Sequence, residues 1–213
     1  MLYPAVLRRA CPVWPAFALT AVLALSACVT TLGGDFDTRR LKALEPGLAT
    51  RERAVATLGD TTDRSQLTLR TDAAGQRLAQ PVAIEKLDYY FLDRAGQTAG
   101  LEKEPRRSAW LLFQGERLIG YSVSSTFAAD STDFDADGIQ QLRRRRSTQD
   151  DVLALFGTPS GKSIHPVALE PGGCRWTYRV QWTADHHLHI KTLQVDFDAE
   201  HVVVDFALST TQG

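Results

Sequence analysis

The chain has 213 residues, and its 24 Lys and Arg residues against 25 Asp and Glu residues leave a formal net charge of −1. A charge so close to zero excludes a strongly basic nucleic-acid-binding protein, so we expect no nucleic-acid partner. The length suits one ordinary domain or two small ones. Beyond residue 27, no apolar run approaches the ~18 residues that a membrane-spanning helix needs.

The N-terminal residues have the pattern of a bacterial signal peptide. Arg8 and Arg9 form a short basic region, and an apolar stretch over residues 16–25 follows them. The string Leu25-Ser26-Ala27-Cys28 closes this stretch with small residues and a cysteine. It resembles the lipobox of bacterial lipoproteins, in which the cysteine becomes the lipidated first residue of the mature chain.

This resemblance implies a division of the N-terminal region. Residues 1–27 are expected to be a lipoprotein signal peptide, Cys28 to carry the lipid, and residues 28–34 to form a tether. Several acyl chains on one residue would anchor the protein stably in a membrane. Val29 stands where an aspartate would indicate retention in the inner membrane, so the resemblance implies the periplasmic face of the outer membrane. A non-cleaved anchor and an ordinary secretory signal are the alternatives.

Cysteine usage predicts a fold without disulfide bonds. Of the three cysteines, Cys11 would leave with the signal peptide and Cys28 would carry lipid, which leaves Cys174 alone. Cys174 lies between two glycines and an alternating apolar string, so we interpret it as the first residue of a strand. A reactive thiol is the alternative.

An internal repeat organises the rest of the chain. Asp35-Phe36-Asp37 recurs 98 positions later as Asp133-Phe134-Asp135, and an offset of 84 relates the ends of the two halves. The repeat predicts two domains, residues 35–128 and residues 129–213. The difference between the offsets indicates extra residues in the first half, and polar stretches around residues 71–80 and 95–107 are the places that favour them.

Each half has the same predicted order of elements. A short helix follows the Asp-Phe-Asp string, and a second helix begins after Thr50 or Thr148, either of which can cap it. Gly59 and Gly157 are expected to end these second helices, and we expect Gly157 to tolerate substitution less well than Gly161. Alternating apolar patterns then predict three strands per half: 82–92, 108–113 and 117–125, and 175–182, 187–197 and 201–208. The predicted fold class is therefore α+β, with two tandem α-α-β-β-β units, each a helix pair packed on a three-stranded antiparallel sheet.

Several strings in the second half carry a resemblance to a known family. They resemble the helix pair and strands of the SmpA/OmlA (BamE-like) family of outer-membrane lipoproteins over residues 136–208. The first half matches more loosely. The tandem arrangement resembles that of β-lactamase-inhibitor proteins. The strings are Ile139-Gln140-Gln141-Leu142, Ser147 to Val152, Leu155 to Pro159, Trp176-Thr177-Tyr178, Thr192 to Phe197 and Val202 to Phe206.

Three strings look like ligand-binding motifs but lack essential parts. Residues 157–163 resemble a phosphate-binding loop with one residue too few between the glycines. Residues 133–138 resemble the start of a calcium-binding loop, but Arg144 stands where a glutamate is needed. His187 and His189 share a strand face without further metal ligands at a recognisable spacing. With no catalytic motif in the chain, we expect a non-enzymatic protein without metal or cofactor.

The run Arg143, Arg144, Arg145 and Arg146 is the one concentrated charge. Basic side chains at a helix C-terminus interact favourably with the helix dipole, so we interpret these arginines as a solvated helix end. Contact with anionic lipid or an acidic protein is the alternative.

Two functions follow as expectations. The family resemblance implies a scaffold or accessory factor in outer-membrane protein assembly or envelope integrity, with membrane lipid and barrel-assembly components as partners. The alternative is a periplasmic protein-binding or inhibitor module that uses a concave sheet.

Overall fold

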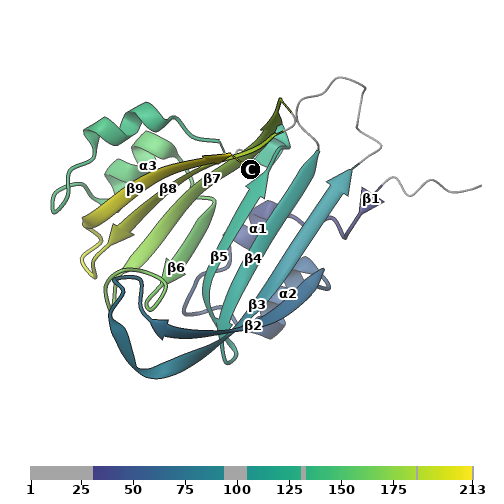
Figure 1. The fold of residues 1–213 in the computed structure, drawn as a ribbon, viewed down its shortest axis with the longest axis horizontal. Helices are drawn as coiled ribbons and strands as arrows, with labels where there is room; N and C mark the ends of the chain where they lie inside the picture. Colours follow the sequence, from purple (N-terminus) through teal and green to yellow (C-terminus); the bar gives the residue numbers. More distant parts are fainter. Residues whose placement is uncertain (1–30, 94–104, 131–132, 186, 213) are drawn as a thin grey trace, which may run out of the picture.

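The computed structural model describes residues 31–93, 105–130, 133–185 and 187–212, so Cys28 and the expected signal peptide lie outside the described residues. The described chain forms one antiparallel sheet with short helices on one of its faces (Figure 1). The strands are β1 (Thr31–Leu32), β2 (Asp63–Thr71), β3 (Arg77–Asp93), β4 (Arg106–Gln114), β5 (Arg117–Ser125), β6 (Gly161–Ile164), β7 (Cys174–Ala184), β8 (His187–Phe197) and β9 (Val203–Gln212). The helices are α1 (Thr38–Lys42), α2 (Arg51–Leu58), α3 (Gln149–Phe156) and the 3-10 turns η1 (Ala128–Asp130) and η2 (Ala136–Gln141).

The sheet runs without interruption from the first half of the chain into the second. Its strand order is β1-β3-β4-β5-β6-β7-β8-β9, and β2 pairs with β3 beside this path. The short strand β6 pairs with β5 on one side, where Ser122 lies opposite Gly161, and with β7 on the other, where Gly161 lies opposite Thr177. This strand joins the two halves into one sheet.

The predicted fold class of two α-α-β-β-β units with separate three-stranded sheets is therefore wrong. The first five strands that the alternating pattern predicts lie within β3, β4, β5, β7 and β8, and the sixth overlaps β9, which begins two residues later than predicted. The pattern predicts neither β2 nor β6. β2 has an almost entirely exposed, polar sequence, and β6 has only four residues, so neither shows the apolar alternation that marks a strand. The helices are also shorter than a helix pair requires. In the second half, the 3-10 turn η2 takes the place of the expected first helix.

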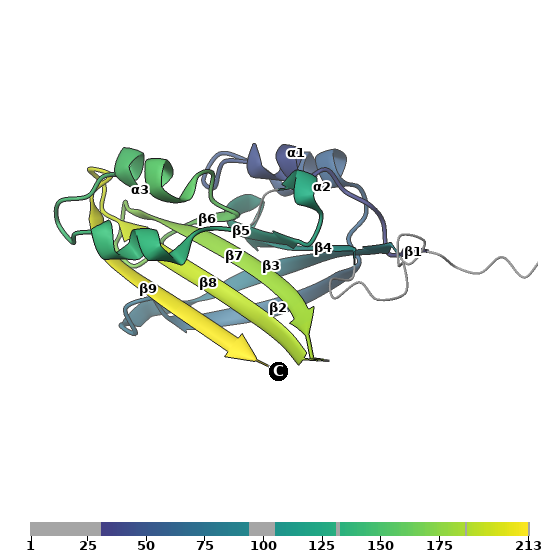
Figure 2. The ribbon, with the colours of Figure 1, turned by 90° about the horizontal axis from the view of Figure 1, so that it is seen from above.

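Two apolar cores lie between the sheet and the helices. In the first, Leu41 of α1 and Leu58 of α2 pack with Leu87, Leu111 and Val123 of the sheet. The second core lies beneath α3 and contains the buried side chains Phe134, Leu142, Val152, Phe156, Tyr178, Leu193, Val195, Phe197 and Val203. Figure 2 shows the helices on one side of the sheet only. Because successive side chains of a strand point to opposite faces, the side chains between these core positions lie on the other face, which we call the open face.

The two halves fix their second helices by equivalent contacts. Thr50 caps α2 and Thr148 caps α3, as expected, and Thr148 forms the full capping box with Asp151. Gly59 and Gly157 end the helices with φ of 83° and 71° and ψ of −166° and −157°. This extended conformation with positive φ, which only glycine adopts readily, replaces the left-handed helical cap typical of helix ends.

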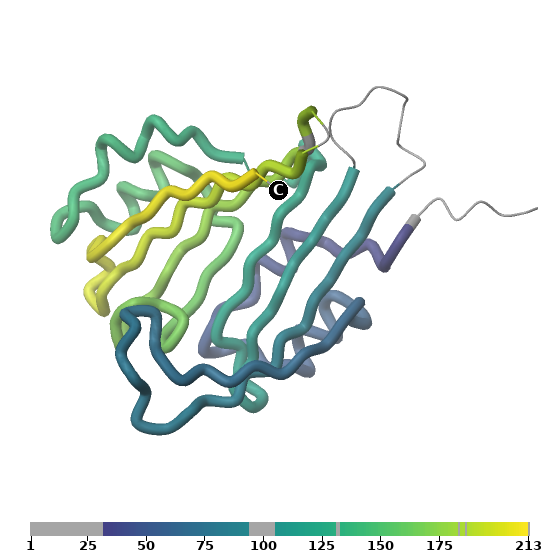
Figure 3. Tube along the Cα trace, viewed as in Figure 1, coloured from purple at the N-terminus to yellow at the C-terminus, as the bar shows by residue number. Residues whose placement is uncertain are grey.

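A long hairpin arm distinguishes the first half. Residues 71–80, where the repeat places extra residues, form the tip of the β2–β3 hairpin, while the other expected place lies largely outside the described residues. The arm crosses one end of the sheet and reaches the turn after β6 (Figure 3). There the Ala73 N–H donates to the Pro166 carbonyl oxygen at 3.1 Å. The arm therefore borders the open face at that end.

The structure gives both glycines a reason to resist substitution, because Gly157 has a positive φ, as expected, and Gly161 has no room for a side chain. A Cβ atom on Gly157 would have no neighbour within 4 Å, whereas a Cβ on Gly161 would lie 2.5 Å from the Tyr121 carbonyl oxygen and 2.9 Å from the Ser122 Cα. Backbone atoms of a paired strand cannot yield without separating the strands. Gly161 therefore permits the close approach of β5 and β6.

We predict that Gly161→Ala destabilises the chain at least as much as Gly157→Ala. Overpacking costs about 1–3 kcal/mol, and a non-glycine residue at positive φ costs about 1–2 kcal/mol. Gly34→Ala is the control, because its Cβ would meet nothing within 4 Å and its φ is not positive. Chemical denaturation measures the free energy of unfolding for all three, and a Gly161→Ala variant as stable as Gly34→Ala would contradict the role of β6.

Candidate functional site

The open face is polar and has aromatic side chains at one side. No helix of the described chain covers it, and in Figure 2 the edge strands β2 and β9 descend away from the helices, which leaves this face concave. Its residues on the central strands are Asp88, Tyr90, Ser108, Trp110, Ser122, Ser124, Arg175, Thr177, Arg179 and Gln181.

A hollow of about 350 Å³ lies on the open face over β3, β4, β5 and β7. We call it the serine–arginine hollow, and its open-face lining consists of Asp88, Tyr90, Ser108, Trp110, Ser122, Ser124 and Arg179. The register explains how these residues meet: Trp110 lies opposite Ser122, and Ser108 opposite Ser124. The volume is at the lower end of the range of small-ligand pockets.

The hollow contains polar groups that lack partners. The Ser122 and Ser124 side chains are each only 2% exposed, and neither hydroxyl oxygen has a hydrogen-bond partner in the described chain. Such groups are uncommon in folded proteins, because a buried unpaired polar atom costs about 1–3 kcal/mol. Two of them side by side on one strand favour a binding site over a purely structural surface.

Arg179 adds an unpaired cation to the same hollow. Its guanidinium forms no ion pair or hydrogen bond with any residue of the described chain, and burial lowers the pKa of Arg179. An arginine stays protonated at physiological pH in spite of such a shift. The hollow therefore contains a partly desolvated positive charge that forms no ion pair with a described carboxylate.

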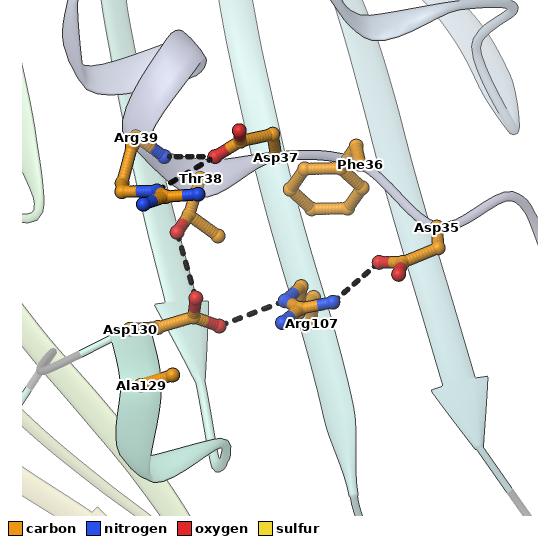
Figure 4. A pocket seen from close by; sticks show the side chains of 8 residues that line it. All are labelled: Asp35, Phe36, Asp37, Thr38, Arg39, Arg107, Ala129 and Asp130. Atoms are coloured by element: carbon orange, nitrogen blue, oxygen red, sulfur yellow. Dashed lines mark hydrogen bonds and ion pairs between the residues drawn. The ribbon is translucent and has the colours of Figure 1, made fainter.

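A second pocket, on the helix side, is built differently, because every charge in it is paired. Figure 4 shows Asp130 between Thr38, whose hydroxyl donates to it at 2.8 Å, and Arg107, whose Nε donates at 2.8 Å. Arg107 also pairs with Asp35, and Ser125 donates to the second oxygen of Asp130. We interpret this pocket as a clasp that holds the segment before α1 against β4.

The protonation of Asp130 follows from these contacts. Burial by itself raises the pKa of the carboxyl, but the hydrogen bonds from Arg107, Ser125 and Thr38 together lower it below its ordinary value of 3.8. The carboxylate is thus ionised at neutral pH and unsuited to acid–base chemistry there.

The four arginines of the run lie in the exposed turn between η2 and α3. Arg143 donates to the Leu142 carbonyl oxygen at 2.8 Å and to the Gln140 carbonyl, as expected at a helix end, although this helix is a 3-10 turn. Arg144 pairs with Asp205 at 2.6 Å, and Arg145 pairs with Glu170 at 3.5 Å. Three of these side chains thus have separate partners, and none of the four lines the serine–arginine hollow.

Arg145 also has an unusual backbone. Its φ is 60°, and in the first half the equivalent position is Gly47, with φ of 92°. The Arg145 N–H donates to the Val203 carbonyl oxygen on β9 and the Gly47 N–H to the Leu118 carbonyl oxygen on β5, both at 2.7 Å. The turn conformation is therefore required by pairing with the sheet, whichever residue occupies it.

Of the two cysteines that would remain in the mature chain, the structure describes Cys174. Cys28 lies outside the described residues. Cys174 is the first residue of β7, as predicted, and its sulfur accepts a hydrogen bond from Gln149 at 3.1 Å. Burial raises the pKa of its thiol to about 11. A thiol with this pKa is almost entirely protonated at neutral pH and a poor nucleophile.

The motif-like strings all have structural roles. The phosphate-loop look-alike begins at Gly157, the residue that caps the end of α3, and contains most of β6. In the calcium-loop look-alike, Asp135 caps η2 by accepting from the Asp137 N–H. His189 stacks on Trp182 with ring centroids 5.2 Å apart. Within the described ranges no group of three potential metal ligands is found, and no helix there is long and apolar enough to span a membrane.

The serine–arginine hollow was not predicted from the sequence. The alternation of β4 and β5 places Ser108 and Trp110, and Ser122 and Ser124, on the face opposite the apolar residues, so a signal is present. The pattern does not reveal that β5 and β7 approach each other where β6 begins. That proximity alone brings Arg179 to the serines.

Comparison with known proteins identifies no relative: no family model matches the chain, and no curated protein or solved structure matches it. The unpaired groups of the serine–arginine hollow therefore identify it as the candidate site.

We predict that Asp130→Asn destabilises the chain at neutral pH by about 1.5–3 kcal/mol, the contribution of a hydrogen bond to a charged group. Because the folded-state pKa of Asp130 is lowered, its contribution is present above the pKa of the unfolded chain and is lost as the pH falls through the folded-state pKa. The difference from wild type should therefore shrink in acid.

Denaturation at neutral and acidic pH measures this difference. Asp137→Asn is the charge-matched control, since Asp137 is exposed and forms no ion pair with described residues. A difference for Asp130→Asn that is independent of pH would show that the carboxylate charge is not what holds the clasp together.

We predict that the arginine run is solvated. Arg143→Gln with Arg146→Gln, and separately Arg144→Gln with Arg145→Gln, should change stability by less than about 1 kcal/mol per site, as exposed ion pairs do. Binding of an unlipidated Cys28→Ser chain to anionic vesicles should be equal for both variants and the parent. Charge screening acts over about 8 Å at physiological ionic strength, so a salt titration detects a direct contact. Weaker, less salt-sensitive vesicle binding at an unchanged melting temperature would instead support lipid contact.

Proposed function

We propose that this chain is a non-enzymatic, lipid-anchored protein-binding module of the bacterial outer membrane, and that it binds its partner through the open face. The carrying observation is the one-sided distribution of helices, which leaves one whole face of the sheet uncovered by the described chain. Antiparallel sheets can present one face to solvent. This one also contains a hollow with unpaired polar groups and aromatic side chains, which are the residue types enriched at protein interfaces.

The N-terminal sequence supports the proposed location in the cell envelope. The lipobox-like string ending at Cys28 supports lipid attachment, and the tether that follows would keep the folded part near the membrane. The non-enzymatic part has the support of the paired carboxylates and the protonated thiol described above.

A scaffold role in outer-membrane protein assembly is the narrower candidate. It has the support of the strings over residues 136–208 that resemble the SmpA/OmlA family. The other candidate, an inhibitor or binding module for a single periplasmic protein, has the support of the concave open face. The two differ in the identity of the partner.

Site-specific photocross-linking in cells tests the binding face. Ala207 is exposed on the open face, and Leu153 is exposed on α3 at the opposite side. With a photoreactive amino acid at each position, we expect a specific cross-linked partner from position 207 and none from 153. Cross-links from 153 alone would contradict the proposed face.

The same membranes identify the partner and test the anchor. Recovery of several outer-membrane assembly components supports the scaffold, whereas recovery of one soluble protein supports the inhibitor. Cys28→Ser should abolish palmitate labelling, because the thiol is the acceptor. Unchanged labelling in that variant would contradict lipid attachment at Cys28.

A further inference from the structure

Two arginines on the open face of β7 differ in whether a carboxylate pairs with them. Arg175 forms a close two-atom ion pair with Asp196, with distances of 2.9 Å and 3.0 Å, and its side chain is 16% exposed. Arg179, four residues further along the same face, has no such partner among the described residues. A desolvated charge without a counter-charge is unfavourable unless a ligand supplies one.

The groups around Arg179 are mostly hydrogen-bond donors. The Ser122 and Ser124 hydroxyls are buried and unpartnered, and both line the hollow with Arg179. The Gln181 amide donates to the Ser108 hydroxyl oxygen at 3.2 Å, so the Ser108 proton remains available. A hydroxyl, a guanidinium and an indole N–H can all donate to one acceptor-rich group.

Among the described residues that line the hollow, Asp88 is the only carboxylate, and a lysine already pairs with it. Asp88 pairs with Lys86 at 2.6 Å. Arg179 is therefore the uncompensated charge in this lining, and it calls for a ligand with a single negative charge. A ligand with two negative charges would place one of them near the Asp88 carboxylate as well as one near Arg179.

We propose that the serine–arginine hollow binds the carboxylate of an aspartate or glutamate side chain presented by the protein partner. This inference rests on the proposed function. Arg179 forms the ion pair, Ser122 and Ser124 donate hydrogen bonds to the carboxylate oxygens, and Trp110 and Tyr90 pack against the aliphatic part of the partner's side chain and its neighbours. Planar carboxylates suit arginine, which can donate two parallel hydrogen bonds to them.

Small probes test the hollow independently of the partner. The full-length chain in detergent is titrated with N-acetylglutamic acid amide, with the neutral N-acetylglutamine amide, and with inorganic phosphate. The readout is the NMR signal of the Arg179 Nε–Hε group, assigned with Arg179→Lys. We expect the glutamate probe to shift this signal with about millimolar affinity, and the glutamine probe to leave it unchanged.

Variants identify the contributing groups. Arg179→Gln should weaken glutamate-probe binding about tenfold or more, and Ser122→Ala with Ser124→Ala should weaken it by a smaller factor. For Arg179→Gln the readout is the Trp110 indole N–H signal, since the arginine signal is lost. Arg70→Gln removes the same charge from an exposed position of β2 and should change nothing.

The outcomes separate this inference from the proposed function. Reduced cross-linking from position 207 in Arg179→Gln, at an unchanged melting temperature, supports the carboxylate contact. Equal binding of both amide probes, tighter binding of phosphate, or loss in Arg70→Gln would overturn it. If position 207 still cross-links its partner fully in Arg179→Gln, the open face remains the binding face but the carboxylate contact is wrong.

Discussion

The rest of the structure depends on the pairing of one four-residue strand. β6 forms hydrogen bonds with β5 on one side and β7 on the other, and it thereby joins two halves that could each have closed on themselves. The pairing needs the missing side chain of Gly161, because a Cβ atom there would overlap the backbone of β5. Since one sheet results, both cores must lie on the same face, with α1, α2 and α3 above them. The opposite face is then left continuous and uncovered by the described chain.

The position of β6 also produces the candidate site. β6 has only four residues, so β5 and β7 approach each other where it begins, with Ser160 between them. The Val123 N–H there donates to the Ser160 carbonyl oxygen at 2.8 Å, and the Gln181 amide reaches across to Ser108 on β4. Arg179 thus comes to line the same hollow as Ser122 and Ser124. The serine–arginine hollow is a consequence of how the two halves join, and neither half contains it alone.

Structural and functional arginines in this protein differ in whether an aspartate pairs with them. Arg107 and Arg175 lie on opposite faces of the sheet, both only 16% exposed, and each has an aspartate with which it forms an ion pair. The two aspartates also hold other parts of the chain: Asp130 accepts from Thr38, the first residue of α1, and Asp196 accepts from the Leu169 N–H. Arg179 forms no ion pair with a described acid, although it too is partly buried. Because a desolvated charge costs free energy, the absence of a partner within the described chain indicates a role in binding.

Local features were predictable from the sequence, because short-range chemistry determines them. The helix caps Thr50 and Thr148, the glycines that end α2 and α3, the strand that begins at Cys174 and the six strands with apolar alternation all agree with the structure. The repeat also led to a wrong fold class, because similarity between two halves does not reveal whether their strands pair with each other. The lipid anchor on Cys28, the solvated arginine run and the family resemblance stay predictions. What only the tertiary structure decided is the joining of β5 to β7 through β6 and the meeting of Arg179 with two serines more than fifty positions earlier. Strand order across a sheet depends on contacts between distant residues, and no local pattern of polar and apolar residues encodes it.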